Sequence, residues 1–225
     1  MAMDVRNKVG YLKMVDIFQD LSDEELEALD SSITIIPCEV GKIFYAPEDT
    51  GEALFIIRKG KVQLYRISPD GRKIVTNTLS PGTIFGEMSL IGQGMYDSFA
   101  EAMENCAVCK MDRTDLERLL LQKPQVAIRI LEVIGKRLVE IEARLEDIAF
   151  KTVAGRLASL LLRLMREQGA TIVGFTHQDL ADALGTYRET TTQTLNKLKA
   201  QGLLDIGRKK IEILDPESLQ LIAEK

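Results

Sequence analysis

Short runs of alternating apolar and polar residues dominate the segment from about residue 34 to residue 111. Turn signals built on glycine, such as Asp70-Gly71 and Pro81-Gly82, separate these runs roughly every ten residues, as in proteins made of many short strands. The segments 61–67 and 73–76 flank the Asp-Gly pair and are typical of a β-hairpin. The pattern predicts a small antiparallel barrel or jelly roll.

Helical spacing occurs on both sides of this segment. Ahead of it, Ser22 and Glu25 can form a capping box that begins a short helix over about residues 23–30. Behind it, a long helix is predicted to begin near Pro124, because apolar residues recur at alternating steps of four and three. These residues are Ala127, Leu131, Ile134, Leu138, Ile141, Leu145 and Ile148.

Three heptads of this kind favour a coiled-coil homodimer. The predicted interface consists of Ile134, Leu138, Ile141, Leu145 and Ile148. An amphipathic helix that packs only on its own barrel is the alternative.

The last third of the chain contains signals for two consecutive short helices. Residues 175–180 form a second predicted capping box, and the helix is expected to end near Leu184-Gly185. Thr186, with Glu189 three residues later, is expected to cap the next helix. The segment 202–214 then alternates around a Gly-Arg-Lys-Lys tip, as a β-hairpin would. Together these elements predict a winged helix-turn-helix.

Charge is distributed unevenly along the chain, which has 225 residues and a net charge of −5. Up to Ala149 there are 18 basic and 25 acidic residues, whereas from Phe150 onward there are 11 and 9. The overall acidity argues against non-specific binding to nucleic acid. Any surface that faces DNA is therefore expected in the C-terminal third.

Residue types limit the chemistry. A single histidine, His177, leaves no basis for a histidine-rich metal site or a Ser-His-Asp triad, and no nucleophile-base pair is visible, so we expect no enzyme. Three cysteines cannot close a disulfide framework, and no apolar run reaches the ~20 residues that span a bilayer. No secretory signal precedes the first helix, and a cytoplasmic location without membrane contact is predicted.

The second helix of the predicted helix-turn-helix carries side chains suited to reading bases. They lie on one stripe and are Arg188, Glu189, Thr192, Gln193 and Asn196. Arginine can bind guanine through two acceptors, glutamate can accept from cytosine, and glutamine can pair with adenine. Contacts to DNA phosphates are expected from Thr176, His177, Thr186, Lys199, Arg208, Lys209 and Lys210. A merely solvated polar face, with Glu189 only completing a capping box, is the alternative.

The order of barrel, long helix and winged helix-turn-helix resembles the Crp/Fnr family of transcription regulators over nearly the full chain. Two segments carry the resemblance most specifically. Phe85-Gly86-Glu87-Met88-Ser89-Leu90 resembles the F-G-E-x-x-L segment of cyclic-nucleotide-binding domains, and residues 184–191 resemble the family's recognition helix. The resemblance implies a homodimer that binds double-stranded DNA at an inverted repeat, contacts RNA polymerase and senses an effector in the barrel.

This sequence departs from the cyclic-AMP-binding members at the positions that would hold the ligand. The resemblance places the effector pocket at Gly86, Glu87, Met88, Asp97, Ser98, Ile141 and Glu142, with Glu87 as the expected ligand of a ribose. Asp97-Ser98 stands where those members have an arginine that neutralises the cyclic phosphate, and Ile141 and Glu142 replace the polar pair that contacts adenine. An acid beside a phosphate is repulsive, so we expect that cyclic AMP is not the effector. The family's frequent recognition-helix arginine is also replaced, by Gln193.

The numbers of cysteine and histidine residues limit the cofactors through which other members of the family sense effectors. An iron-sulfur cluster of the Fnr type needs four cysteines, and the chain has only Cys38, Cys106 and Cys109, so a single-chain site is excluded. Haem is not expected, because His177 lies in the predicted DNA-binding domain. Cys106 and Cys109 are interpreted as small buried residues on opposite faces of a strand, with a thiol switch as the alternative.

We therefore predict an α+β protein with three parts. Residues 1–122 form a cyclic-nucleotide-binding-like β jelly roll, residues 123–149 a coiled-coil dimerisation helix, and residues 150–225 a winged helix-turn-helix. The expected function is a sequence-specific transcriptional regulator that needs no ligand. Regulation by an unidentified small molecule is the alternative. A regulatory module of an enzyme or channel would lack the helix-turn-helix, and an architectural DNA binder would be basic overall.

Overall fold

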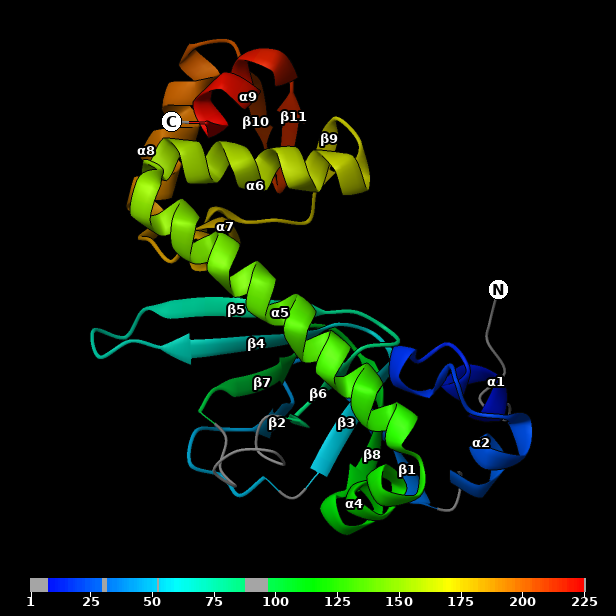
Figure 1. Cartoon of the computed structure of the whole chain (residues 1–225). Helices are drawn as coiled ribbons and strands as arrows, with labels where there is room; N and C mark the ends of the chain where they lie inside the picture. Colours follow the sequence, from blue (N-terminus) through cyan, green and yellow to red (C-terminus); the bar gives the residue numbers. More distant parts are fainter. Residues whose placement is uncertain (1–7, 30–31, 52, 88–96, 225) are drawn as a thin grey trace. The chain divides into compact units, whose positions relative to one another are not determined.

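The structure is a computed structural model that describes residues 8–29, 32–51, 53–87 and 97–224. The chain divides into two compact units. The first contains residues 1–66 and 76–137, and the second contains residues 67–75 and 138–225. Figure 1 shows the elements of both units.

Two four-stranded sheets form the β core, which confirms the predicted jelly roll. One sheet has the order β1 (Ile33–Cys38), β8 (Cys106–Asp112), β3 (Ala53–Lys59) and β6 (Ile84–Phe85). The other has the order β2 (Ile43–Tyr45), β7 (Phe99–Ala102), β4 (Val62–Ile67) and β5 (Lys73–Leu79). The predicted hairpin is β4 and β5, which run side by side in Figure 1. Gly71 in its loop adopts a positive φ of 81°.

Strand β3 is buried on both faces and separates two hydrophobic clusters. Leu54 and Ile56 belong to one cluster, whereas Phe55 and Ile57 belong to the other, as the two-residue period of a strand requires. The cluster of Phe55 and Ile57 also contains residues from the second sheet, such as Val62 and Ala100. It is therefore the interior of the sandwich.

The other cluster lies where helices cover the first sheet. It includes residues of α1 (Lys8–Leu12), η1 (Asp16–Phe18), α2 (Asp23–Leu29), α4 (Arg113–Gln122) and α5 (Pro124–Phe150). The capping box at the start of α2 is confirmed, because Ser22 N donates to Glu25 Oε2 at 2.8 Å and Glu25 N donates to Ser22 Oγ at 3.3 Å. The sequence pattern did not predict α1 or η1.

The long helix α5 has one set of apolar residues that packs on the barrel and another set that is exposed. Val126 and Ile130 are buried in the cluster that covers the first sheet, and Ile134 packs partly against it. Five other apolar positions of the predicted spacing are exposed by more than half: Leu131, Leu138, Ile141, Leu145 and Ile148. Packing on the barrel therefore involves the first half of the helix, whereas the seam from Leu138 to Ile148 is exposed in the described part of the chain.

The second unit contains the predicted winged helix-turn-helix. Its helices are α6 (Val153–Gln168), α7 (His177–Leu184), α8 (Arg188–Ala200) and α9 (Pro216–Ala223). Strands β10 (Leu204–Gly207) and β11 (Lys210–Ile213) form the wing, and β9 (Thr171–Val173) extends its sheet. Leucine and isoleucine side chains from the helices and strands share one core. The elements α6, β9 and α9 were not predicted from the sequence.

The prediction that Thr186 caps α8 is wrong. The N-cap is Tyr187, whose side chain makes no capping hydrogen bond. Gly185 ends α7 in the left-handed conformation with a φ of 63°, and the N–H of Thr186 then donates to the carbonyl of Ala181 at 3.0 Å. The backbone of Thr186 thus completes the preceding helix, and α8 begins one residue later than expected.

Candidate nucleic-acid and effector sites

Helix α8 separates a polar stripe from a buried face. Arg188, Glu189, Gln193 and Asn196 are exposed, and Thr192 is half-buried. The opposite face consists of Thr191, Thr194, Leu195 and Leu198, all buried. The stripe predicted from spacing therefore lies on one accessible face of the helix. Its donors and acceptors are those that recognise base edges in a major groove.

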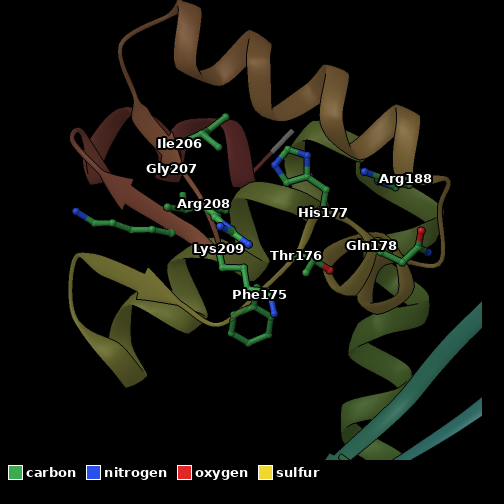
Figure 2. A pocket seen from close by; sticks show the side chains of 11 residues that line it. Phe175, Thr176, His177, Gln178, Arg188, Ile206, Gly207, Arg208 and Lys209 are labelled. Atoms are coloured by element: carbon green, nitrogen blue, oxygen red, sulfur yellow. The ribbon is translucent and has the colours of Figure 1, made fainter.

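A basic hollow lies between the start of α7, the start of α8 and the wing. It has a volume of about 490 Å³ and is lined by Phe175, Thr176, His177, Gln178, Arg188, Ile206, Gly207, Arg208, Lys209, Lys210 and Ile211. Figure 2 shows His177 with Arg188 on one side and the residues of the wing on the other. No acidic residue is among those lining residues, so the hollow is suited to an anion.

The basic residues that are expected to contact phosphates differ in whether they already form an ion pair. Lys199 pairs with Asp205 at 2.7 Å, which lowers the pKa of that carboxyl, and Lys210 pairs with Glu212 at 3.0 Å. Arg208 and Lys209 at the tip of the wing are exposed and make no ion pair with any residue that the structure describes. The two tip residues are therefore the more available cations.

Thr176 begins α7 with the predicted capping box. Asp179 N donates to Thr176 Oγ1 at 3.1 Å, and Thr176 N donates to Asp179 Oδ2 at 2.7 Å. The Thr176 hydroxyl also donates to the same carboxylate oxygen, at 2.7 Å. These bonds fix the first turn of α7, where His177 and Gln178 line the hollow. His177 Nδ1 lies 2.9 Å from Thr192 Oγ1 of α8.

In the first unit, the expected ribose ligand Glu87 is already in an ion pair. Its side chain is almost fully buried, and Arg137 of α5 donates to Glu87 Oε1. A second nitrogen of the same guanidinium donates to the carbonyl of Ile84. Burial raises the pKa of the Glu87 carboxyl, although Arg137 acts in the opposite direction. Glu87 Oε2 has no hydrogen-bond partner among the described residues.

Asp97 also has a basic partner. Arg66, on β4, donates to Asp97 Oδ2, and both side chains are more than half exposed. Gly86 is buried and Ser98 is half-buried, whereas Met88 lies outside the described residues. Ile141 and Glu142 belong to the second unit and are exposed on α5. Sequence reasoning missed Arg66 and Arg137, because partners distant in the chain leave no local signal.

The three cysteines are free and buried. Cys106 and Cys109 lie in different hydrophobic clusters, which agrees with the prediction of opposite faces. Cys38 on β1 is paired in register with Cys106 on β8, a relationship that the sequence did not reveal. Within the described residues, no group of histidine, cysteine and carboxylate side chains could hold a metal ion. No described helix is long and apolar enough to cross a bilayer.

Two family models match the chain and cover both units. A cyclic nucleotide-binding domain matches residues 36–123, and a Crp-like helix-turn-helix domain matches residues 155–222. The first range contains Glu87, Asp97 and the strands of both barrel sheets except the first three residues of β1, and the second contains the polar stripe of α8 and the wing.

Similar proteins and structures agree with these models. The Cyclic AMP receptor protein of Thermus thermophilus is 30% identical over 94% of this chain and 98% of its own length. A CRP-like cAMP-activated global transcriptional regulator of Mycobacterium tuberculosis is 29% identical over 92% of this chain and 96% of its own. A putative regulator of the crp/fnr family from Eubacterium rectale superposes with a TM-score of 0.80 at 21% identity, covering 95% of this chain and 100% of that one. The chain belongs to the Crp/Fnr family of DNA-binding transcriptional regulators.

Proposed function

We propose that the protein is a homodimeric transcriptional regulator that reads an inverted-repeat operator without cyclic AMP. The observation that carries this proposal is the accessible polar stripe of α8 beside a wing tip whose cations have no ion-pair partner in the described chain. In this role the five residues of the stripe face base edges. The DNA backbone is bound by Thr176, Thr186 and Lys199 and by the wing residues Arg208, Lys209 and Lys210.

The proposed dimer uses the second half of the seam on α5. Leu138, Ile141, Leu145 and Ile148 recur at steps of three, four and three, and each is between 55% and 64% exposed. Burying such a row against a second copy contributes at most roughly 1.5–3 kcal/mol for each large side chain, because each is already partly covered. Ile134 contributes less, because it already packs partly against the first unit. We keep the division into residues 1–122, 123–149 and 150–225 as the proposed functional division.

Independence from cyclic AMP is inferred from the two ion pairs in the first unit. A ligand ribose would have to compete with Arg137 for Glu87, and a cyclic phosphate would meet the carboxylate of Asp97. Arg66 neutralises Asp97, and its guanidinium is then engaged in that ion pair and not in binding a phosphate. Control by the protein's abundance is then the simplest regulation. Contacts with RNA polymerase, a cytoplasmic location and the lack of enzymatic activity are parts of the same proposal.

A comparison of two substitutions tests whether α8 reads sequence. We expect Arg188→Ala to lose about 1–3 kcal/mol of discrimination at one base pair. Lys209→Ala, at the tip of the wing, is the matched control and is expected to weaken binding to all duplexes by a similar factor and to reduce the salt dependence. Uniform weakening by Arg188→Ala would contradict the assignment of α8 to base reading.

A further inference from the structure

The single histidine of the chain joins the first turn of α7 to the middle of α8. His177 Nδ1 lies 2.9 Å from Thr192 Oγ1, and both side chains are half-buried. Thr191 and Thr194 instead donate their hydroxyls to the carbonyls of Tyr187 and Thr190, one turn earlier. The hydroxyl of Thr192 thus contacts a side chain on another helix, whereas the hydroxyls of Thr191 and Thr194 bond within α8.

Hydrogen bonds within the first turn of α7 hold His177 in place independently of Thr192. It is the first residue of α7, directly after the N-cap Thr176, and the capping box with Asp179 holds that turn. Gln178 Nε2 donates to Asp182 Oδ1 at 2.7 Å, which adds a second side-chain hydrogen bond on the surface of α7. The imidazole therefore approaches Thr192 from a rigid support.

A threonine hydroxyl has one proton, so its bond to an imidazole decides what it offers to a third group. If Thr192 donates to Nδ1, its free lone pairs can accept from the amino group of adenine or cytosine. If Nδ1 carries a proton and donates to Oγ1, the hydroxyl proton is free for N7 of either purine, O6 of guanine or O4 of thymine. Either arrangement limits the bases that Thr192 can read.

We propose that His177 is a positioning residue that sets the base preference of Thr192, rather than a contact to phosphate. This rests on the proposed function, because it requires α8 to face base edges. Arg188 from α8 and Arg208, Lys209 and Lys210 from the wing line the hollow with His177, and the exposed cations Arg208 and Lys209 can bind a phosphate there without His177. Nδ1 of His177 is directed to Thr192 instead.

Two substitutions of His177 separate the roles. The amide of asparagine can reach the position of Nδ1, whereas the amide of glutamine reaches that of Nε2, so His177→Asn keeps the bond and His177→Gln loses it. Thr192→Val removes the hydroxyl while retaining the shape. Each variant and the double variant of His177→Gln with Thr192→Val are titrated with duplexes in which every base pair of the selected half-site is varied in turn. Thermal melting confirms that each variant is folded.

We expect His177→Gln to change the preference at one base pair by about two- to tenfold, the range of one net hydrogen bond, and His177→Asn to restore it. In the Thr192→Val background, His177→Gln should have no further effect on preference. A uniform loss of affinity, or an effect that persists without the Thr192 hydroxyl, would overturn the positioning role alone. If the native protein prefers no duplex, the proposed function fails as well.

Discussion

Arg137 of α5 and Glu87, which follows β6, form an ion pair at a carboxylate that is only 3% exposed. Breaking a buried pair of this kind usually costs several kcal/mol, because one charge is left without its partner. The pair therefore links the long helix to the segment that would bind a ribose in cyclic-nucleotide-binding members. It is a local reason for the proposed insensitivity to cyclic AMP.

The pH dependence of stability tests the environment of Glu87. Burial raises the pKa of this carboxyl, so the folded state holds its proton more tightly than the unfolded state. The contribution of Glu87 to the free energy of unfolding is then most favourable below the ordinary pKa of 4.5 and declines as the pH rises above it. We expect Glu87→Gln to flatten this decline, as measured by urea unfolding between pH 4 and 7.

Glu25→Gln is the control, because the contribution of Glu25 to stability changes with pH in the opposite direction to that of Glu87. Lys123 lowers the pKa of Glu25, so its stabilisation is present above the ordinary value and is lost as the pH falls through the folded-state value. This variant should lose stability mainly at the higher pH. Equal pH profiles for Glu87→Gln and the native protein would contradict the described environment of Glu87.

Gly60 is required by a close approach to Cys106. Its φ is +87°, and a Cβ built there would lie 2.6 Å from Cys106 Sγ and 2.9 Å from the carbonyl oxygen of Asn105. We expect Gly60→Ala to lower the free energy of unfolding by at least about 2 kcal/mol, because a clash adds to the backbone strain. Gly41→Ala is the control, with a φ of +82° and open space, and should cost about 1 kcal/mol. Similar losses in both variants, measured by urea unfolding, would refute the role of packing.

The cysteines should be unreactive in the folded protein. Burial raises the pKa of the Cys38 and Cys106 thiols, which keeps them from forming the reactive thiolate at neutral pH. We expect slow alkylation of both in the native protein and rapid alkylation in urea, followed by mass spectrometry. If a strong oxidant forms a disulfide, it should join Cys38 to Cys106, which are paired in register, and not Cys106 to Cys109. Rapid native labelling would support a thiol switch instead.

Charged substitutions in the exposed seam of α5 test the dimer. We expect the combined change Ile141→Glu and Leu145→Glu to convert the protein to a monomer in sedimentation velocity experiments, because charges in an apolar coiled-coil seam repel. Lys136→Glu, at an exposed polar position of the same helix, is the control and should leave the mass unchanged. A dimer that persists in the double variant would place the interface elsewhere.

Local signals explain which elements could be predicted. The capping boxes of Ser22 and Thr176 involve partners three residues away, so the sequence predicts both correctly. Thr186 has the same spacing to Glu189, but the end of α7 uses its backbone, and the prediction fails there. Spacing on α8 also identifies the accessible stripe, because one helix face follows directly from its period.

Contacts between distant segments explain what could not be predicted. Cys38 meets Cys106 only through the register of β1 and β8, and Arg66 of β4 reaches Asp97, which precedes the neighbouring strand β7. No pattern of spacing in the sequence reveals either contact. The hydrogen bond between His177 and Thr192 is of the same kind, since it depends on how α7 packs against α8.

Selection of binding sites from a random duplex library tests the central claim most directly. Purified protein is used at a fixed physiological salt concentration, once without ligand and once with cyclic AMP. We predict the same inverted repeat in both experiments, with half-site centres about one helical turn, ~34 Å, apart. Enrichment only with cyclic AMP would contradict the proposed ligand independence, and no enrichment in either experiment would contradict ligand-free sequence reading by α8.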